Sequence, residues 1–151
     1  MSSRDLLRSS IMPYLNTYRG RISASGIRYG SVLYVAFGKG ISKAHVGRAS
    51  TTRYPVELEI GSDTWVLTKD NDMILDSQFD NIQEARSEIH NILVGRKMLD
   101  IETTQTEGIV TFDANLVLRS CIVPEPGSGF LYSFQVQNGP EWETLDGAEL
   151  R

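Results

Sequence analysis

"DNIQEARSEIHNILVG", residues 80–95, carries apolar side chains at the spacing of a helix. These side chains fall on one stripe, made by Ile82, Ala85, Ile89, Ile92 and Leu93. Such a stripe predicts an amphipathic helix with one buried face. Asp80 and Gln83 have the spacing of a capping box at its start, and Gly95 is suited to its end.

Strand-like segments lie on both sides of this helix. Before it, "SVLYVAF" (31–37) is β-branched and aromatic, and "VELEI" (56–60) alternates between apolar and acidic residues. After it come "KMLDIETTQ" (97–105), "GIVTFD" (108–113) and "FLYSFQV" (130–136). Runs of strands beside few helices predict an α+β protein, with antiparallel sheet packed against two helices.

The halves 1–77 and 78–151 share a coarse order of elements. A helix predicted over residues 3–18 ends near Gly20-Arg21, and the helix described above ends near Gly95-Arg96. Each half then runs through several strands to an aromatic strand followed by a polar turn. We therefore expect one compact domain, residues 1–151, with a two-fold internal repeat.

Charge is distributed unevenly along the chain. Residues 1–56 contain nine basic residues and one acid, whereas residues 57–151 contain six basic residues and 18 acids. Three interpretations remain open. The two parts pack together and their fields partly cancel, an anionic partner binds the basic part, or a basic partner binds the acidic part.

The basic part includes "FGKGISKAHVGRASTTRYP", residues 37–55. It lacks the residue order of a phosphate-binding P-loop, and no helix pattern follows it to hold a phosphate. We predict a mobile loop that is either solvated or in contact with a partner. The residues that would make this contact are Lys39, Lys43, His45, Arg48 and Arg53.

Metal, cofactor and membrane signals are weak. Cys121 is the single cysteine, so neither an internal disulfide nor a cysteine-based metal site is expected. Asp70, Asp72 and Asp76 lack the residue pattern of a calcium-binding loop and predict a hairpin turn with solvated acids. No stretch has the length and apolarity of a membrane span or signal peptide, so we expect a cytoplasmic protein without cofactor.

Catalytic signals are also weak. His45 and His90 are the only histidines, and neither lies in a pattern typical of a catalytic base. The strand-to-helix motif that presents a nucleophilic serine does not occur. We therefore expect a protein that is not an enzyme.

Four short motifs in the last 60 residues carry a resemblance to a family. They are Leu93-Val94-Gly95-Arg96, Phe112-Asp113-Ala114-Asn115-Leu116, Gly139-Pro140 and Gly147-Ala148-Glu149-Leu150. With them, the chain resembles small uncharacterised bacterial domains, some of which are similar to immunity proteins encoded beside polymorphic toxins. The family pattern has a tryptophan where this chain has Phe134. The resemblance implies a partner-binding protein and brings no catalytic residue.

These observations together predict a non-catalytic protein-binding module that neutralises a toxin or effector by occlusion. The acidic strands and loops of the second half would occlude the partner, and the expected contacts besides those at 37–55 are Asp70, Asp72 and Trp142. Trp65 and Trp142 are expected in corresponding regions of the two halves, either in the core or as an interface anchor. The alternative function is binding of nucleic acid or an anionic ligand through residues 6–56.

Overall fold

The computed structural model describes most of the chain. It covers residues 12–28, 32–45, 47–60, 64–103, 107–121, 132–138 and 141–145. Within these ranges only the backbone is described for residues 43–45, 48–51, 103, 121, 132–138 and 141–145.

A short helix at residues 12–17 opens the described part of the chain, and strands and one longer helix follow. In chain order these are β1 (Ile22–Arg28), β2 (Val32–Phe37), β3 (Ile41–His45), β4 (Arg48–Arg53), β5 (Val56–Ile60), β6 (Thr64–Lys69), β7 (Asp72–Asp76), α2 (Ile82–Leu93), β8 (Met98–Thr103), β9 (Glu107–Phe112), β10 (Leu116–Cys121), β11 (Tyr132–Asn138) and β12 (Glu141–Leu145). The predicted α+β class, with antiparallel sheets and two helices, is confirmed.

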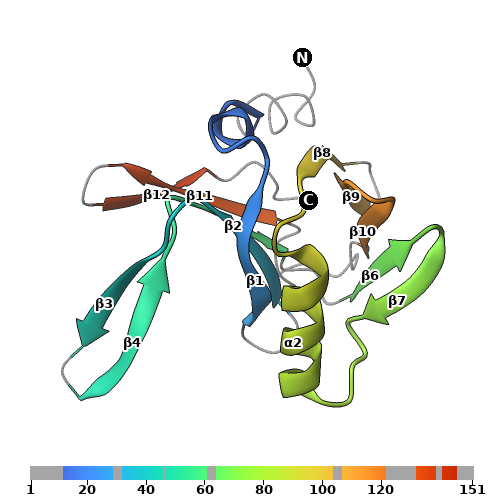
Figure 1. Ribbon diagram of the computed structural model, residues 1–151, viewed down its shortest axis with the longest axis horizontal. Helices are drawn as coiled ribbons and strands as arrows, with labels where there is room; N and C mark the ends of the chain where they lie inside the picture. Colours follow the sequence, from blue (N-terminus) through green and yellow to red (C-terminus); the bar gives the residue numbers. More distant parts are fainter. Residues whose placement is uncertain are drawn as a thin grey trace, which may run out of the picture.

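The strands form two five-stranded sheets and one separate pair (Figure 1). The first sheet has the order β1-β2-β5-β11-β12, and the second sheet has the order β7-β6-β10-β9-β8. β3 and β4 pair only with each other. Every strand pair in the described part of the chain is antiparallel.

The two sheets have matching strand orders. Each begins with three antiparallel strands that follow a helix, β1-β2-β5 in one sheet and β8-β9-β10 in the other. Each is completed by the last hairpin of the opposite half, β11–β12 in the first sheet and β6–β7 in the second. Duplication of the sequence itself stays a prediction, but the sheet orders are those that a two-fold repeat with exchanged hairpins would have.

A β-bulge occurs at the same place in both sheets. In the first sheet the register shifts between Ile22 and Ala24, opposite Phe37 at the end of β2. In the second sheet it shifts between Met98 and Asp100, opposite Phe112 at the end of β9. Because a bulge bends its strand locally, equal bulges give both sheets a similar curvature at this point.

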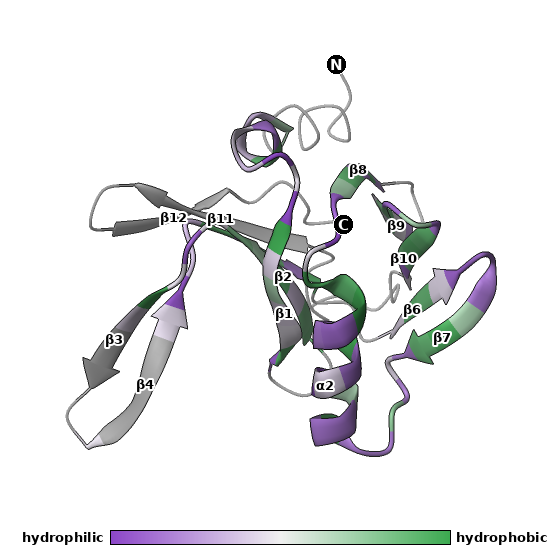
Figure 2. Cartoon of the chain, viewed as in Figure 1, coloured by the Kyte–Doolittle hydropathy of each residue, from purple (hydrophilic) through white to green (hydrophobic). Residues whose placement is uncertain are grey.

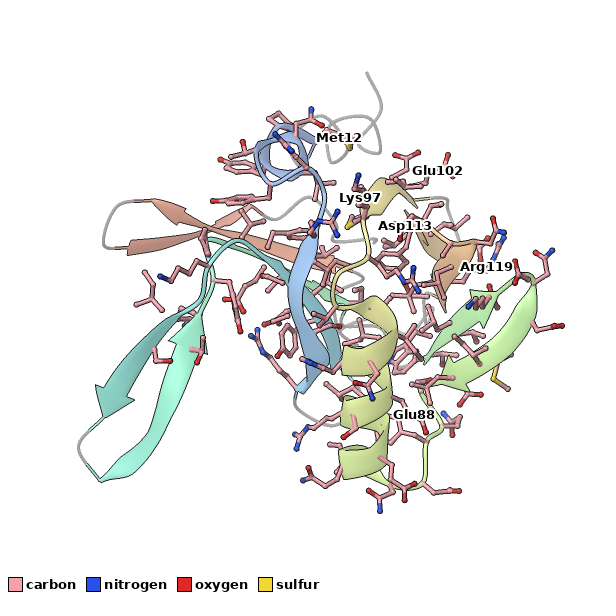
Figure 3. The ribbon with its side chains drawn as sticks, in the orientation of Figure 1. Met12, Glu88, Lys97, Glu102, Asp113 and Arg119 are labelled. Atoms are coloured by element: carbon pink, nitrogen blue, oxygen red, sulfur yellow. The ribbon has the colours of Figure 1, made fainter. Side chains whose placement is uncertain are left out.

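The two Gly-Arg segments meet in the middle of the molecule. Arg21 and Lys97 form an antiparallel bridge, the Ile22 amide donates to the Arg96 carbonyl over 2.9 Å, and the Met98 amide donates to the Gly20 carbonyl over 2.7 Å. Lys97 lies next to Asp113, whose carboxylate accepts from the Lys97 amide over 3.1 Å (Figure 3). The backbone thus links the first strand of one sheet to the first strand of the other.

Gly20 is required at this meeting point for two reasons. Its φ is +66°, in the left-handed region that side chains disfavour. A Cβ atom on Gly20 would also lie 2.5 Å from the carbonyl oxygen of Met98, which is backbone and has little freedom to move. Only a glycine lets the two chain segments approach this closely.

The core lies between the two sheets and the buried stripe of α2. The helix contributes Ala85, Ile89 and Leu93, while its other sides are hydrophilic (Figure 2). The largest fully buried side chains are Trp65, Phe37, Phe112, Ile22, Leu33, Leu58, Ile60, Leu67 and Ile89. Each such side chain contributes roughly 1.5–3 kcal/mol to folding by leaving water.

One of the predicted helix ends needs a correction. α2 begins after Asn81, whose side chain accepts from the amides of Gln83 and Glu84 at 3.0 and 3.1 Å, so the cap is Asn81 and the expected cap at Asp80 is wrong. The first helix is described only over residues 12–17, and the earlier part of the predicted range lies outside the described residues. Its end at Gly20 is as expected, because the Gly20 amide donates to the Leu15 carbonyl over 2.7 Å.

Candidate functional site

Residues 38–55, called the arm below, are a β-hairpin rather than the predicted mobile loop. β3 and β4 pair from Ile41 opposite Arg53 to His45 opposite Arg48, with a register shift between Lys43 and His45. Figure 1 shows this hairpin extending away from both sheets. The prediction is wrong because the pairing depends on backbone hydrogen bonds, which a stretch without apolar alternation does not reveal.

Close packing at its base sets the direction of the arm. A Cβ atom on Gly40 would lie 2.7 Å from the Tyr54 ring, so this ring rests directly on the glycine backbone. Gly38 has a φ of +86°, and a Cβ atom there would lie 2.9 Å from both Pro55 and Tyr18. These contacts hold the two ends of the arm against each other and place them against Tyr18, next to the first helix.

A group of charged residues, called the root cluster below, lies on the first sheet near the base of the arm. Arg28 at the end of β1 forms ion pairs with both Glu57 and Glu59 of β5, and its Nη1 atom is 2.8 Å from the Glu59 carboxylate. Burial alone would lower the pKa of Arg28, but hydrogen bonds and charges from Glu57, and then Glu59, outweigh it and raise that pKa. Arg28 therefore stays charged and offsets one of the two carboxylate charges.

Tyr34 completes the root cluster from the neighbouring strand β2. The Arg28 guanidinium lies 3.9 Å above the centre of the Tyr34 ring, which is a cation–π contact. Burial raises the pKa of Tyr34, so its hydroxyl keeps its proton at neutral pH. The arrangement holds the aromatic ring flat against the sheet.

Glu57 is the most buried member of the root cluster. Its side chain is 0 % exposed, and its Oε2 atom makes no hydrogen bond. Nη1 of Arg53, the last residue of β4, is 4.0 Å from this oxygen. The base of the arm therefore contributes a second cation to the carboxylate that Arg28 already binds.

The predicted contact residues fall on separate surfaces. Five of them belong to the arm or its base: Lys39 and Arg53 have exposed side chains, and Lys43, His45 and Arg48 lie on β3 and β4 with their side chains outside the description. Trp142 lies on β12, and its side chain is also outside the description. Asp70 and Asp72 lie on the β6–β7 hairpin, on the far side of α2 from the arm in Figure 1.

The β6–β7 turn confirms the predicted hairpin and ties down one of its acids. Asp70 and Asn71 have φ of 51° and 68°, which is typical of a tight two-residue hairpin turn. The Asp70 carboxylate accepts from the Asn115 side chain over 2.9 Å, so it joins this turn to the β9–β10 turn. Met73 beside it is 60 % exposed on the edge strand β7.

Trp65 and Trp142 both lie in the last hairpin of their half, but on different strands of it. Trp65 lies on β6, which stands next to the three-stranded part of its sheet, whereas Trp142 lies on the edge strand β12. Trp65 is fully buried and belongs to the core.

The root cluster was not predicted from the sequence. The alternation of "VELEI" indicated only that Glu57 and Glu59 share one face of a strand. Their partner Arg28 is separated from Glu57 by more than 20 residues and reaches it only because β2 lies between β1 and β5. The available signal was a basic residue, Arg28, at the end of a strand-like segment. Which strand this residue faces depends on the order of the strands in the sheet.

Neither a cluster of metal-binding side chains in the described part of the chain nor a match to a known protein points to a particular chemistry. Within the described ranges, no three His, Cys, Asp or Glu side chains come together as a metal site, and no helix has the length and apolarity to cross a membrane. No known family model, curated protein or solved structure matches the chain.

Proposed function

We propose that this chain is a non-catalytic protein-binding module of the immunity type, which grips an acidic surface of its partner with the arm. The observation that carries the proposal is the place at which the arm is inserted between two strands of the first sheet. It connects β2 to β5, whereas β9 and β10 at the equivalent place in the second sheet are connected by the short turn at residues 113–115. Bacterial origin and a cytoplasmic location stay predictions.

The arm adds little to the core of the molecule. β3 and β4 pair only with each other, and Ile41, which begins β3, is 60 % exposed. An isolated two-stranded hairpin is only marginally stable in water. A chain segment that adds little to folding but is held firmly at its base is well suited to contact another molecule.

The charge of the arm indicates the chemistry of the partner. Residues 38–55 contain two lysines, two arginines and a histidine but no acid. Complementary charge speeds encounter and suppresses wrong partners, so an acidic protein surface fits best. The root cluster sets a boundary to this basic surface, because Glu57 and Glu59 there carry one negative charge more than Arg28 offsets.

The experiment is a charge reversal on the arm. A triple variant with Lys39→Glu, Lys43→Glu and Arg48→Glu is compared with the wild type for a 1:1 complex on size exclusion after capture from a nuclease-treated lysate. The reversal should weaken the complex at least about tenfold, because attraction becomes repulsion at the contact.

A matched control changes the net charge equally elsewhere. Lys69, Lys97 and Arg119 are exposed and lie outside the arm, and their reversal to Glu should leave the complex intact. If both triple variants weaken binding to the same extent, the arm is not the contact surface and the proposal fails.

Nucleic acid is the second candidate partner, and the shape of the arm favours it. The major groove of B-DNA admits a two-stranded β-ribbon, which is the structure that β3 and β4 form. A nucleic-acid complex would be lost on nuclease treatment, and its affinity would fall steeply with salt because phosphate contacts release counterions. A nuclease-resistant 1:1 complex with a protein decides against this alternative.

A further inference from the structure

An open depression of about 390 Å³ lies between α2 and the first sheet. Its sheet side includes Gly26 of β1 and Tyr34 of β2. Its helix side includes Arg86, Ser87 and His90, which all lie on α2 and are exposed. The depression therefore borders the root cluster through the shared residue Tyr34.

Gly26 creates part of the space on the sheet side. A Cβ atom at this position would lie 3.1 Å from Cε1 and 3.4 Å from the hydroxyl of Tyr34. Because glycine leaves this volume open, the Tyr34 ring can lie low over β1 and turn its hydroxyl toward the depression. The Arg28 guanidinium lies over the same ring, 3.9 Å from its centre, and holds it in place.

Arg86 is fixed in place by the sheet. Its Nε atom donates to the carbonyl of Ile27 over 3.0 Å, so the guanidinium is anchored at the wall of the depression. Within the described part of the chain, no carboxylate lies within ion-pair distance of Arg86. Its two terminal nitrogens are thus positioned donors without an acidic partner.

The polar lining consists of groups that can donate hydrogen bonds, and it contains no carboxylate. Arg86 supplies the permanent positive charge, and the side chains of Ser87, His90 and Asn91 add donors from the same helix. The carboxylates of Glu57 and Glu59 on the same sheet are bound by Arg28, and Arg53, 4.0 Å from Glu57, is placed to balance the remaining negative charge. A donor-rich concave surface with one fixed arginine is complementary to an anion.

We propose that this depression binds a single anionic group, a carboxylate or a phosphate, with the Arg86 guanidinium as its main ligand. The hydroxyl groups of Tyr34 and Ser87 and the His90 ring complete the contacts. This site is distinct from the arm and does not depend on the proposed protein partner.

The test is a titration of the full chain followed by amide NMR shifts at Gly26, Ser87 and His90. Sodium phosphate and sodium acetate are added separately, with sodium chloride used to keep the ionic strength constant. Saturable shifts at these residues support the site. The anion whose titration reaches saturation shows whether the bound group is a phosphate or a carboxylate. Shifts that stay linear, or that spread over the surface as with chloride, overturn the proposal.

Two pairs of variants make the assignment specific. Ser87→Asp places a negative charge at the rim and should weaken binding at least about tenfold, because a repelled carboxylate replaces a hydrogen bond to the anion. Gln78→Glu adds the same charge at an exposed position before α2, outside the lining of the depression, and should leave binding unchanged. Arg86→Met should abolish saturation, whereas Arg119→Met on β10 should not (Figure 3). If the two variants of either pair weaken anion binding to the same extent, the site is refuted.

Discussion

The connection from β2 to β5 and the connection from β9 to β10 join strands at equivalent places in the two sheets, yet they are very different. In the second sheet the chain turns through Asp113, Ala114 and Asn115, with φ of 58° and 59° at the last two residues. In the first sheet the chain makes the whole arm before it returns to the sheet. The same sheet geometry therefore tolerates either a minimal turn or a long hairpin.

The outer faces of the same strands also differ. β5 and β10 both bury alternate apolar residues, with Leu58 and Leu118 fully buried. At the positions on either side of Leu58, β5 carries Glu57 and Glu59, which are bound by Arg28. At the positions on either side of Leu118, β10 carries the half-buried Val117 and the exposed Arg119. The residues that make the core are alike, and the residues that could contact another molecule are not.

This difference separates the requirements of folding from those of binding. The shared strand order and the shared bulges form the frame on which the buried residues of both sheets lie. The root cluster lies on the first sheet, the depression lies between that sheet and α2, and the arm is inserted between its strands β2 and β5. Four comparisons test how far the equivalence of the two sheets extends.

The largest effect is expected for the two core leucines. Leu58→Ala and Leu118→Ala each remove a fully buried side chain, and each should lower the free energy of unfolding by roughly 2–5 kcal/mol. Urea unfolding at 25 °C measures both. Losses that agree within about 1 kcal/mol support equivalent positions, given the spread seen for one substitution type. A near-neutral result at either leucine would contradict the core described above.

The two glycines that follow the helices should respond unequally. Gly95→Ala should cost about 1–2 kcal/mol, since its φ of +87° is strained for alanine but nothing lies within 4 Å of the new Cβ. Gly20→Ala has the same conformational cost and also overlaps the Met98 carbonyl at 2.5 Å, so its loss should be larger. The same urea experiment compares them. Equal losses would mean that the two halves do not approach closely at Gly20.

Arg28→Met tests the root cluster. It removes the donor to Glu57 and leaves a fully buried carboxylate without its main partner, at a cost of about 3 kcal/mol or somewhat less, because Arg53 remains nearby. The double variant Arg28→Met with Glu57→Val, which copies the valine at the corresponding place on β10, should recover much of this loss. Failure of the double variant to recover would show that Arg28 stabilises the sheet through its packing rather than its charge.

The smallest effect on stability is expected when the arm is shortened to its base. Replacing residues 42–51 by Asp-Ala-Asn, the turn at 113–115, keeps Arg53 and the packed base and should change the free energy of unfolding by no more than about 1 kcal/mol, because an isolated hairpin adds little stability. The same variant should lose partner binding completely. A large loss of stability would assign the arm to the fold and remove the main support for its binding role.

The sequence predicted the fold class and most of the elements, and it was less successful for the site. The helix at residues 82–93 and the β6–β7 hairpin follow from local periodicity and turn residues. The hairpin in the arm was missed because its residues do not alternate between apolar and polar. Arg28, Tyr34 and Arg86 were missed because each acts through residues distant in the sequence.

By itself, the sequence determined most of the segments that form strands and helices, though not β3 and β4, because these properties depend on the spacing of neighbouring side chains. Only the tertiary structure decided that each half lends its last hairpin to the opposite sheet, that Gly20 touches Met98, and that Arg28 meets Glu57. A hydrophobic period shows that a face must be covered but does not show what covers it. That choice depends on how both sheets pack at once.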